Sequence, residues 1–441
     1  MELDKTTLND LSIFTADEEH SLFHKLNLAR TVGGRGKLRE NFSHSLPGVP
    51  EIISIQKIIA LIHGRRSSWP LQISNGSMMV IHKFYESVID NIPNNSSSSG
   101  AYAYKLFHRP DFSLVRYSVE HCFDFIAGMK TIIELFPGKK PLPMEKLTRR
   151  AFDIMDKPQF KVIGQKKKSS DLTIAEMLNL ANFLLYNYKQ NMFELIEIFY
   201  QFDAWYAMAM AMEKYDLVFP EFTEDKLPNL QAEGLRHLLL SDPVAYDVTL
   251  DLNKNFMFLT GANMAGKSTF IKSVGSAVFL AHLGMGVPAR SMKLTLFDGL
   301  LSNINVVDDI SKGESYFFNE VQRIKNTILK INDGRRWLIL IDELFKGTNV
   351  LDAMKCSTAV IEGLLKIRSS LFILSTHLYE IGEQLSVSPN ISFKYFETLV
   401  NEDELSFSYQ LKEGISNDRI GYLILKREKI LELLQNLNGK D

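Results

Sequence analysis

The chain has 441 residues, of which 45% are hydrophobic and 23% are charged, and its formal net charge at pH 7 is −2. This length exceeds one ordinary hydrophobic core and predicts two or three globular domains. The nearly neutral charge offers no global attraction to nucleic acid, so DNA binding would need a local basic face. The two cysteines, Cys122 and Cys356, exclude a disulfide framework and a cysteine-rich metal site.

The sequence has neither of the common membrane signals. It contains no run of about eighteen uninterrupted apolar residues, and its first residues, Met1 to Asp4, lack the basic start of a signal peptide. We therefore expect a cytoplasmic protein that has no membrane partner.

Apolar spacing in the first half of the chain predicts helices. An apolar stripe with steps of four and three residues runs from Cys122 to Phe136, and Ser118 is its candidate N-cap. A second helix is expected from Thr173, where Glu176 completes a capping box. A third is expected from Met192 to about Tyr215, and its acidic residues favour a buried helix over a membrane span.

Polar segments separate these helices. Residues 93–100 and 137–143 have the composition of surface loops, and the run Lys166 to Lys168 fits a solvated loop better than a phosphate contact. From about Phe219 onward, short β-rich runs alternate with glycine turns and helices, as in α/β proteins. The predicted domains are residues 1–218, mainly helical, and residues 219–441, α/β.

Residues 261–269 read GANMAGKST and lie between an apolar strand pattern and a helical pattern. This setting predicts a phosphate-binding loop, in which Gly261 and Gly266 allow the chain to curl. Lys267 would reach the β- and γ-phosphates, Ser268 would hold Mg²⁺, and Thr269 would lie near the α-phosphate. The alternative is a chance glycine turn with a surface lysine.

Two further apolar strands end in polar residues. Residues 337–341 lead into Asp342 and Glu343, and residues 371–374 lead to His377 two residues after Ser375. Since ligands bind at the carboxyl ends of parallel strands, Asp342 is the candidate Mg²⁺ ligand and Glu343 the group that polarises an attacking water. His377 would donate a hydrogen bond to the γ-phosphate, although such a histidine is often only structural.

A polar segment, residues 311–320, leads into another helical pattern. Ser315 at this helix start would make a second anion site, able to touch the γ-phosphate of a facing subunit. An ordinary helix cap explains the same residues equally well, and the sequence leaves both interpretations open.

Together these blocks resemble the MutS family of DNA mismatch-repair ATPases, whose phosphate loop reads TGPNMGGKST where this chain reads TGANMAGKST. The Asn263–Met264 pair is more specific than a general phosphate-loop pattern. The resemblance continues in further segments along the chain: residues 7–11, 21–23, 30–35, 202–204, 233–237, 287–289, 308–310, 313–320, 342–349 and 375–377.

The resemblance implies a helical core and lever domain followed by an ABC-type P-loop ATPase domain with a mainly parallel sheet. It also implies that Asn263, Met264, Val244 and Tyr246 contribute to an ATP pocket, and that the ATPase domains form a head-to-tail homodimer in which Ser315 reaches across. DNA or a repair protein would be the partner.

Several positions depart from the family pattern. The family's mismatch-reading and connector domains precede the helical core, whereas here the core pattern starts at the first residues, so direct mismatch reading is not expected. Phe345 and Lys346 replace Gly-Arg, Tyr246 replaces an Asn near adenine, and Arg419 replaces a serine. An aromatic ring at 246 could stack on adenine. Residues 422–437 leave room for only a short closing helix.

The expected function is Mg-ATP hydrolysis coupled to DNA handling in repair or recombination. An ATP-switched protein-interaction module that does not grip DNA is the alternative, and a small-molecule kinase is a third and weaker interpretation.

Overall fold

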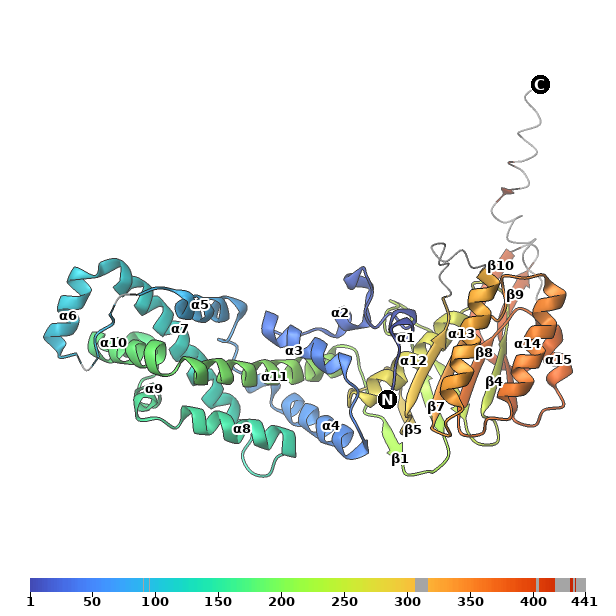
Figure 1. The fold of residues 1–441 in the computed structure, drawn as a ribbon, viewed down its shortest axis with the longest axis horizontal. Helices are drawn as coiled ribbons and strands as arrows, with labels where there is room; N and C mark the ends of the chain where they lie inside the picture. Colours follow the sequence, from blue (N-terminus) through green and yellow to red (C-terminus); the bar gives the residue numbers. More distant parts are fainter. Residues whose placement is uncertain are drawn as a thin grey trace, which may run out of the picture. The chain divides into compact units, whose positions relative to one another are not determined.

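The computed structural model describes residues 1–89, 91–94, 96–305, 316–401, 404–416, 429, 430 and 433 (Figure 1). Contacts divide the chain into two compact units. The α/β unit comprises residues 1–25, 45–52 and 215–441, and the helical unit comprises residues 26–44 and 53–214. In this division the first 25 residues belong with the α/β unit, whereas the sequence placed them with the helices. The overall class, helices together with an α/β part, is as predicted.

The helical unit contains most of the chain's first half. Its helices are α3 (Val32–Ser43), α4 (Val49–Gly64, whose first residues belong to the α/β unit), α5 (Asn75–Glu86), α6 (Ser98–Phe107), α7 (Arg109–Glu134), α8 (Leu142–Met155), α9 (Lys161–Gln165), α10 (Ile174–Asn182) and α11 (Lys189–Lys214). Within the described ranges, each helix is too short or too polar to reach across a lipid bilayer.

The sequence patterns predicted three of these helices, α7, α10 and α11, with one error. Thr173 and Glu176 form the predicted capping box of α10, and α11 covers the predicted third helix. Ser118 is not an N-cap, because it is buried within α7. That helix starts earlier because Pro110 suits a first turn and because Phe112 and Val115 extend the buried stripe toward the N-terminus.

A buried carboxylate joins α11 to the segment before α3. Asp203 is fully buried and accepts hydrogen bonds from the Thr31 hydroxyl at 2.7 Å, the Thr31 N–H at 2.9 Å and the Arg30 N–H at 3.0 Å. A Cβ at Gly34 would lie 2.1 Å from the Asp203 carboxylate, so the close approach of α3 to α11 requires glycine there.

The α/β unit carries two sheets. Its elements are α1 (Lys5–Asp10), α2 (Leu22–Leu26, whose last residue belongs to the helical unit), β1 (Glu221–Thr223), β2 (Leu230–Leu235), β3 (Tyr246–Leu250), β4 (Phe256–Thr260), α12 (Lys267–His282), β5 (Ser291–Thr295), β6 (Gly299–Asn303), α13 (Tyr316–Ile331), β7 (Trp337–Asp342), α14 (Val350–Leu364), β8 (Leu371–Ser375), α15 (Tyr379–Leu385), β9 (Ile391–Asn401) and β10 (Glu404–Glu413).

The larger sheet has the strand order β10-β9-β4-β8-β7-β6. Strands β9, β4, β8, β7 and β6 pair in parallel, whereas β10 pairs antiparallel to β9. The smaller sheet, β1-β5-β2-β3, combines parallel and antiparallel pairs. Both sheets are therefore mixed, and β4, β8 and β7 lie next to one another with their carboxyl ends at one edge.

Helices pack against both faces of the larger sheet, which explains its continuous apolar strands. All residues of β4, β7 and β8 are buried. Helices α13, α14 and α15 lie beside the sheet (Figure 1), and their apolar side chains share one core with alternate strand residues such as Phe258, Ile339 and Phe372. Helix α12 contacts β7 and β8.

A second buried carboxylate joins α1 to the end of β6. Asp10 is 2% exposed and accepts hydrogen bonds from the Ser302 hydroxyl at 2.6 Å and from the N–H groups of Ile304 at 3.0 Å and Asn305 at 3.2 Å. Its ion pair with Arg323 of α13 measures 3.1 Å. Helix α1 is therefore an integral part of the α/β unit.

Replacing Asp10 with alanine should destabilise the α/β unit by about 3 kcal/mol, because the change removes the carboxylate partner of Arg323 and leaves two buried N–H groups without their acceptor. Urea unfolding monitored by circular dichroism measures the change. Asp17→Ala is the matched control, since Asp17 is 68% exposed and pairs only with His20 among the described ion pairs; it should shift stability by less than about 0.5 kcal/mol. Equal effects of the two substitutions would contradict the structural role of Asp10.

Candidate functional site

The glycine-rich loop between β4 and α12 has the backbone geometry of an anion cradle. Gly261 has φ +132° and Gly266 has φ +109°, values that favour glycine, and a Cβ at Gly261 would lie 3.1 Å from the Phe396 carbonyl oxygen. Met264 also has a positive φ of 70° and is 69% exposed. Helix α12 begins at Lys267, so its free N–H groups and its dipole face the loop.

Lys267 lies beneath this loop. Its ammonium donates hydrogen bonds to the carbonyl oxygens of Gly261 at 2.7 Å and Ala262 at 2.9 Å, and it lies 3.5 Å from Nε2 of His377. Burial lowers the pKa of Lys267 to about 8, although the nearby carboxylates of Glu343 and Asp342 act in the opposite direction. The backbone of the loop thus positions the Lys267 side chain.

The two predicted Mg²⁺ ligands meet at the sheet edge. Asp342, the last residue of β7, is 8% exposed, and its Oδ2 lies 2.5 Å from the Ser268 hydroxyl. The hydroxyl of Ser375, at the end of β8, donates to the other carboxylate oxygen of Asp342. Asp342 is therefore held by the adjacent strand on one side and by α12 on the other.

Glu343 is held by two side chains that can carry positive charge. Its Oε1 lies 2.6 Å from Nε2 of His377, and its Oε2 lies 3.0 Å from Nζ of Lys346. Burial alone would raise the pKa of the Glu343 carboxyl, but the contacts with His377 and Lys346 outweigh burial and lower the pKa to about 2. The backbone of Glu343 adopts φ 62°, and its N–H donates to the Ser375 carbonyl at 2.9 Å.

A buried glutamate fixes the turn that carries Lys346. Glu320 of α13 is 4% exposed and accepts hydrogen bonds from the N–H groups of Lys346 at 3.0 Å and Gly347 at 3.1 Å. Phe345 in the same turn has φ 59°. Glu320 of α13 thus helps to position the turn whose Lys346 side chain contacts Glu343.

The glycine-rich loop, the start of α12 and the two acidic residues border a cavity of about 460 Å³. The predicted residues Val244, Tyr246, Asn263, Met264, Gly266, Lys267, Ser268, Thr269, Asp342 and Glu343 all line it. Gly261 and His377 reach it through their contacts with Lys267. Ser315 and residues 308–310 lie outside the described residues, as do Arg419 and almost all of the predicted closing helix.

The walls of this cavity include aromatic rings. Tyr246 is 6% exposed, and its ring packs edge-on against Phe270 and Phe396 at centroid distances of 5.4 and 5.6 Å. Tyr409 of β10 is 41% exposed and lines the same cavity, as do Leu240 and Asp242. Tyr409 therefore has the more available ring face for a planar base.

Sequence reasoning missed several of these contributors. Ser375 directly precedes the Thr376–His377 pair, so its place at a strand end could have revealed it. Tyr409 and Glu320 reach the site through long-range packing, and no local motif marks them. Lys346 was noted as a departure from a pattern, but its contact with Glu343 was not foreseen.

The side-chain oxygens in the site are suitable ligands for the magnesium ion of a magnesium nucleotide. Hydroxyl and carboxylate oxygens from Ser268 and Asp342 suit Mg²⁺, which binds through one or two carboxylates together with phosphates. Among the described residues, no group of three or more His, Cys, Asp and Glu side chains could hold a metal ion alone. Phosphate oxygens would therefore complete the coordination.

A glycine-rich loop at a helix N-terminus, with acidic residues at the end of a nearby parallel strand, is the arrangement of phosphate-binding α/β proteins. Comparison with known proteins narrows this class. Residues 257–432 match the family model MutS domain V.

Individual relatives give the same result. The DNA mismatch repair protein MutS of Pseudothermotoga lettingae is 31% identical over 232 residues, that of Carboxydothermus hydrogenoformans 30% over 274, and that of Staphylococcus haemolyticus 26% over 271. These matches cover 52%, 60% and 60% of this chain but only 28%, 32% and 30% of the respective relatives. The resemblance to the MutS family is thus confirmed, and the residues that match the family model lie within the α/β unit.

The lowered pKa of Lys267 predicts how nucleotide affinity depends on pH. The amine of the free protein is protonated below about pH 8 and neutral above it. Above about pH 8 the affinity for ATP should therefore fall by up to about tenfold per pH unit, because binding must take up a proton. Fluorescence titration from about pH 7 to about pH 9.5 measures this. Calorimetry in two buffers of different ionisation enthalpy should show proton uptake at high pH; a flat profile would contradict the prediction.

Proposed function

We propose that the chain is a MutS-like ATPase that binds and hydrolyses Mg-ATP in the cavity bordered by the β4–α12 loop. The convergence of Lys267, Ser268, Asp342 and Glu343 on one cavity carries this proposal. A neutral or apolar ligand would not need a lysine, a helix N-terminus and two acidic groups at one place.

Each residue has a role in this proposal. Lys267 exchanges its carbonyl partners for the β- and γ-phosphate oxygens, and the N-terminus of α12 binds the phosphates through N–H groups. Thr269 lies near the α-phosphate, and the base enters between Val244, Tyr246 and Tyr409. Ser268 and Asp342 hold Mg²⁺, which neutralises charge on the phosphates when it is bound.

Glu343 orients the attacking water, and His377 donates a hydrogen bond near the γ-phosphate. A carboxylate whose pKa lies near 2 is a weak base, and both of its oxygens are engaged by His377 and Lys346. One of these contacts therefore opens when nucleotide and water bind.

The family resemblance supports the wider part of the proposal. The ATPase domains form a head-to-tail homodimer in which Ser315 of one subunit touches the γ-phosphate held by the other. The helical core and levers couple hydrolysis to DNA binding in repair or recombination, or to a repair-protein partner. The alternative is a protein-interaction module switched by ATP without DNA binding, and the near-neutral net charge favours it.

Two substitutions should separate binding from hydrolysis. Lys267→Ala removes the charge-assisted phosphate contact and should weaken ATP binding by about tenfold to a hundredfold. Glu343→Gln should leave binding within about twofold and lower turnover by about a hundredfold or more. Fluorescent-nucleotide titration and phosphate release measure the two quantities. The exposed residues Lys355 and Glu362 of α14 provide controls, Lys355→Ala and Glu362→Gln. Normal turnover by Glu343→Gln would refute the assignment.

DNA coupling is tested by ATP turnover with duplex, mismatched and branched DNA at several salt concentrations, with Lys267→Ala as the background. Stimulation by one DNA form, weakening as salt rises, is the expected result, because phosphate contacts release counterions. Turnover that ignores every DNA form would refute DNA coupling and favour the protein-interaction alternative, while the ATPase assignment would stand.

A further inference from the structure

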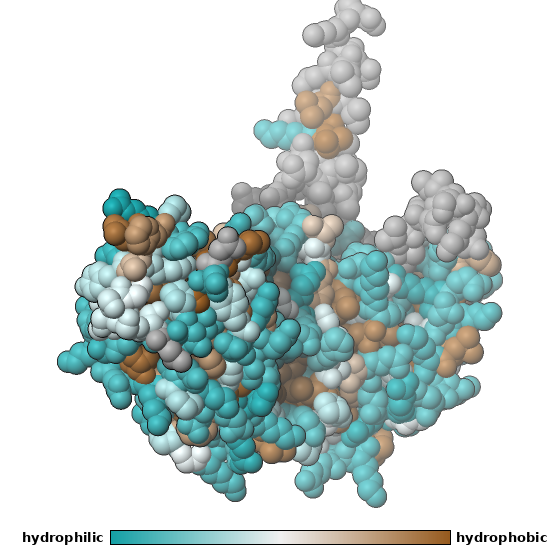
Figure 2. All heavy atoms as spheres, turned by 60° about the vertical axis from the view of Figure 1, so that its left-hand side comes forward, coloured by the Kyte–Doolittle hydropathy of each residue, from teal (hydrophilic) through white to brown (hydrophobic). Residues whose placement is uncertain are grey.

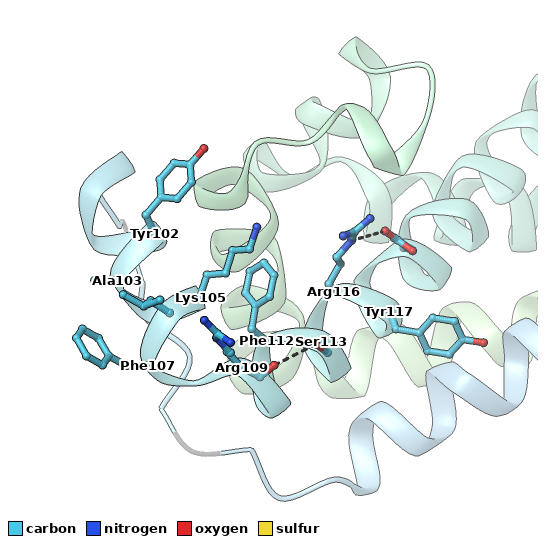
Figure 3. A pocket seen from close by; sticks show the side chains of 11 residues that line it. Tyr102, Ala103, Lys105, Phe107, Arg109, Phe112, Ser113, Arg116 and Tyr117 are labelled. Carbon is cyan, nitrogen blue, oxygen red and sulfur yellow. Dashed lines mark hydrogen bonds and ion pairs between the residues drawn. The ribbon is translucent and has the colours of Figure 1, made fainter.

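The corner between α6 and α7 forms a hollow on the surface of the helical unit. Only His108 separates the end of α6 from the start of α7. Side chains from these two helices line a cavity of about 920 Å³, shown in Figure 3. We call this cavity the α6–α7 groove.

Large apolar side chains around the groove face water. Tyr102 is 64% exposed, Leu106 58%, Phe107 79% and Tyr117 54%. Tyr102 and Leu106 lie four residues apart and so share one face of α6. Figure 2, which turns this part of the chain forward, shows apolar groups among hydrophilic ones. Exposed apolar side chains clustered around one hollow mark an interaction surface.

The same groove carries positive charge. Lys105, Arg109 and Arg116 line it (Figure 3), and Arg116 pairs with Glu120 at 3.0 Å. In the part of the chain that the structure describes, neither Lys105 nor Arg109 has a carboxylate at ion-pair distance. The Lys105 ammonium lies 5.6 Å from the centre of the Phe112 ring. Two cations are thus left for a ligand beside an apolar floor.

We propose that the α6–α7 groove binds an acidic segment of a partner protein that carries aromatic or aliphatic anchors. Carboxylates of the segment pair with Lys105 and Arg109, which orients it and speeds the encounter. Its apolar anchors cover Leu106, Phe107 and Tyr117, as in the binding of an amphipathic helix to a groove. Charge and apolar surface are both complementary to this single occupant.

A nucleic acid fits the groove less well. Its electrostatic attraction grows with the number of phosphates that cations neutralise, and among the described residues that line the groove only Lys105 and Arg109 are cations with no acidic partner. The exposed rings of Tyr102, Phe107 and Tyr117 could stack on bases, so the small number of unpaired cations is what favours a protein segment over a nucleic acid.

The test uses the full chain and a short fluorescein-labelled peptide in which Asp and Glu alternate with Leu and Phe at helical spacing. The comparison probes are the same peptide with Lys at every acidic position and single-stranded oligothymidylate. Fluorescence anisotropy should show that the acidic peptide binds at least about tenfold more tightly than its lysine counterpart. Phe107→Asp and the double change Lys105→Glu with Arg109→Glu should each weaken it by at least about tenfold.

Matched controls separate the groove from the general surface. Val88→Asp changes another apolar residue, 95% exposed, and Lys139→Glu changes another exposed cation; both should bind the acidic peptide like the unmodified chain. Because the changed side chains are exposed, circular dichroism should be unaltered. No binding of the acidic peptide, equal binding of both peptides, or binding that survives the groove substitutions would overturn the proposal. Tighter oligothymidylate binding lost in the same variants would overturn it in favour of nucleic acid.

Discussion

The parallel pairing of β8 between β4 and β7 is the constraint on which the candidate site depends. Because the three strands run in the same direction, their carboxyl ends place the glycine-rich loop, the two acidic residues and His377 within hydrogen-bond reach. Ser375, at the end of the central strand, contacts Asp342 through its side chain and Glu343 through its carbonyl. A one-residue shift in strand register would send Asp342 to the opposite face of the sheet and separate it from Ser268.

The backbone of the glycine-rich loop is pre-organised for phosphate binding, whereas the charged side chains of the site are paired with groups of the protein. The positive φ angles of Gly261 and Gly266 are built into the loop, so binding a phosphate requires no large backbone change there. The charged side chains, in contrast, satisfy one another: Lys267 binds carbonyl groups, Ser268 binds Asp342, and Glu343 binds two neighbours. A nucleotide would therefore exchange existing interactions for new ones, and its net affinity reflects the difference between the two sets.

The sequence predicted the local features well and the long-range ones poorly. The glycine spacing around Lys267 and the apolar runs before Asp342 and His377 are local signals, and they located strands, loop and helix. Ser118 was misassigned because its apolar stripe continues toward Pro110 without a break in periodicity. Asp10 and Glu320 act on residues far along the chain, so no spacing in their neighbourhood reveals their partners.

The contact of α1 with β6 has a consequence for biosynthesis. The α/β unit is discontinuous in sequence, since it combines residues 1–25 and 45–52 with residues 215–441. Within it, Asp10 of α1 binds Ser302, which lies 292 positions later. At about 5–20 residues per second, α1 leaves the ribosome about 15–60 s before its acceptor strand is made. During that time the intervening helical unit can fold on its own local contacts, whereas closing the α/β unit waits for nearly the whole chain. Helix α1 is thus among the first parts of the chain to be synthesised and among the last to pack in its native position.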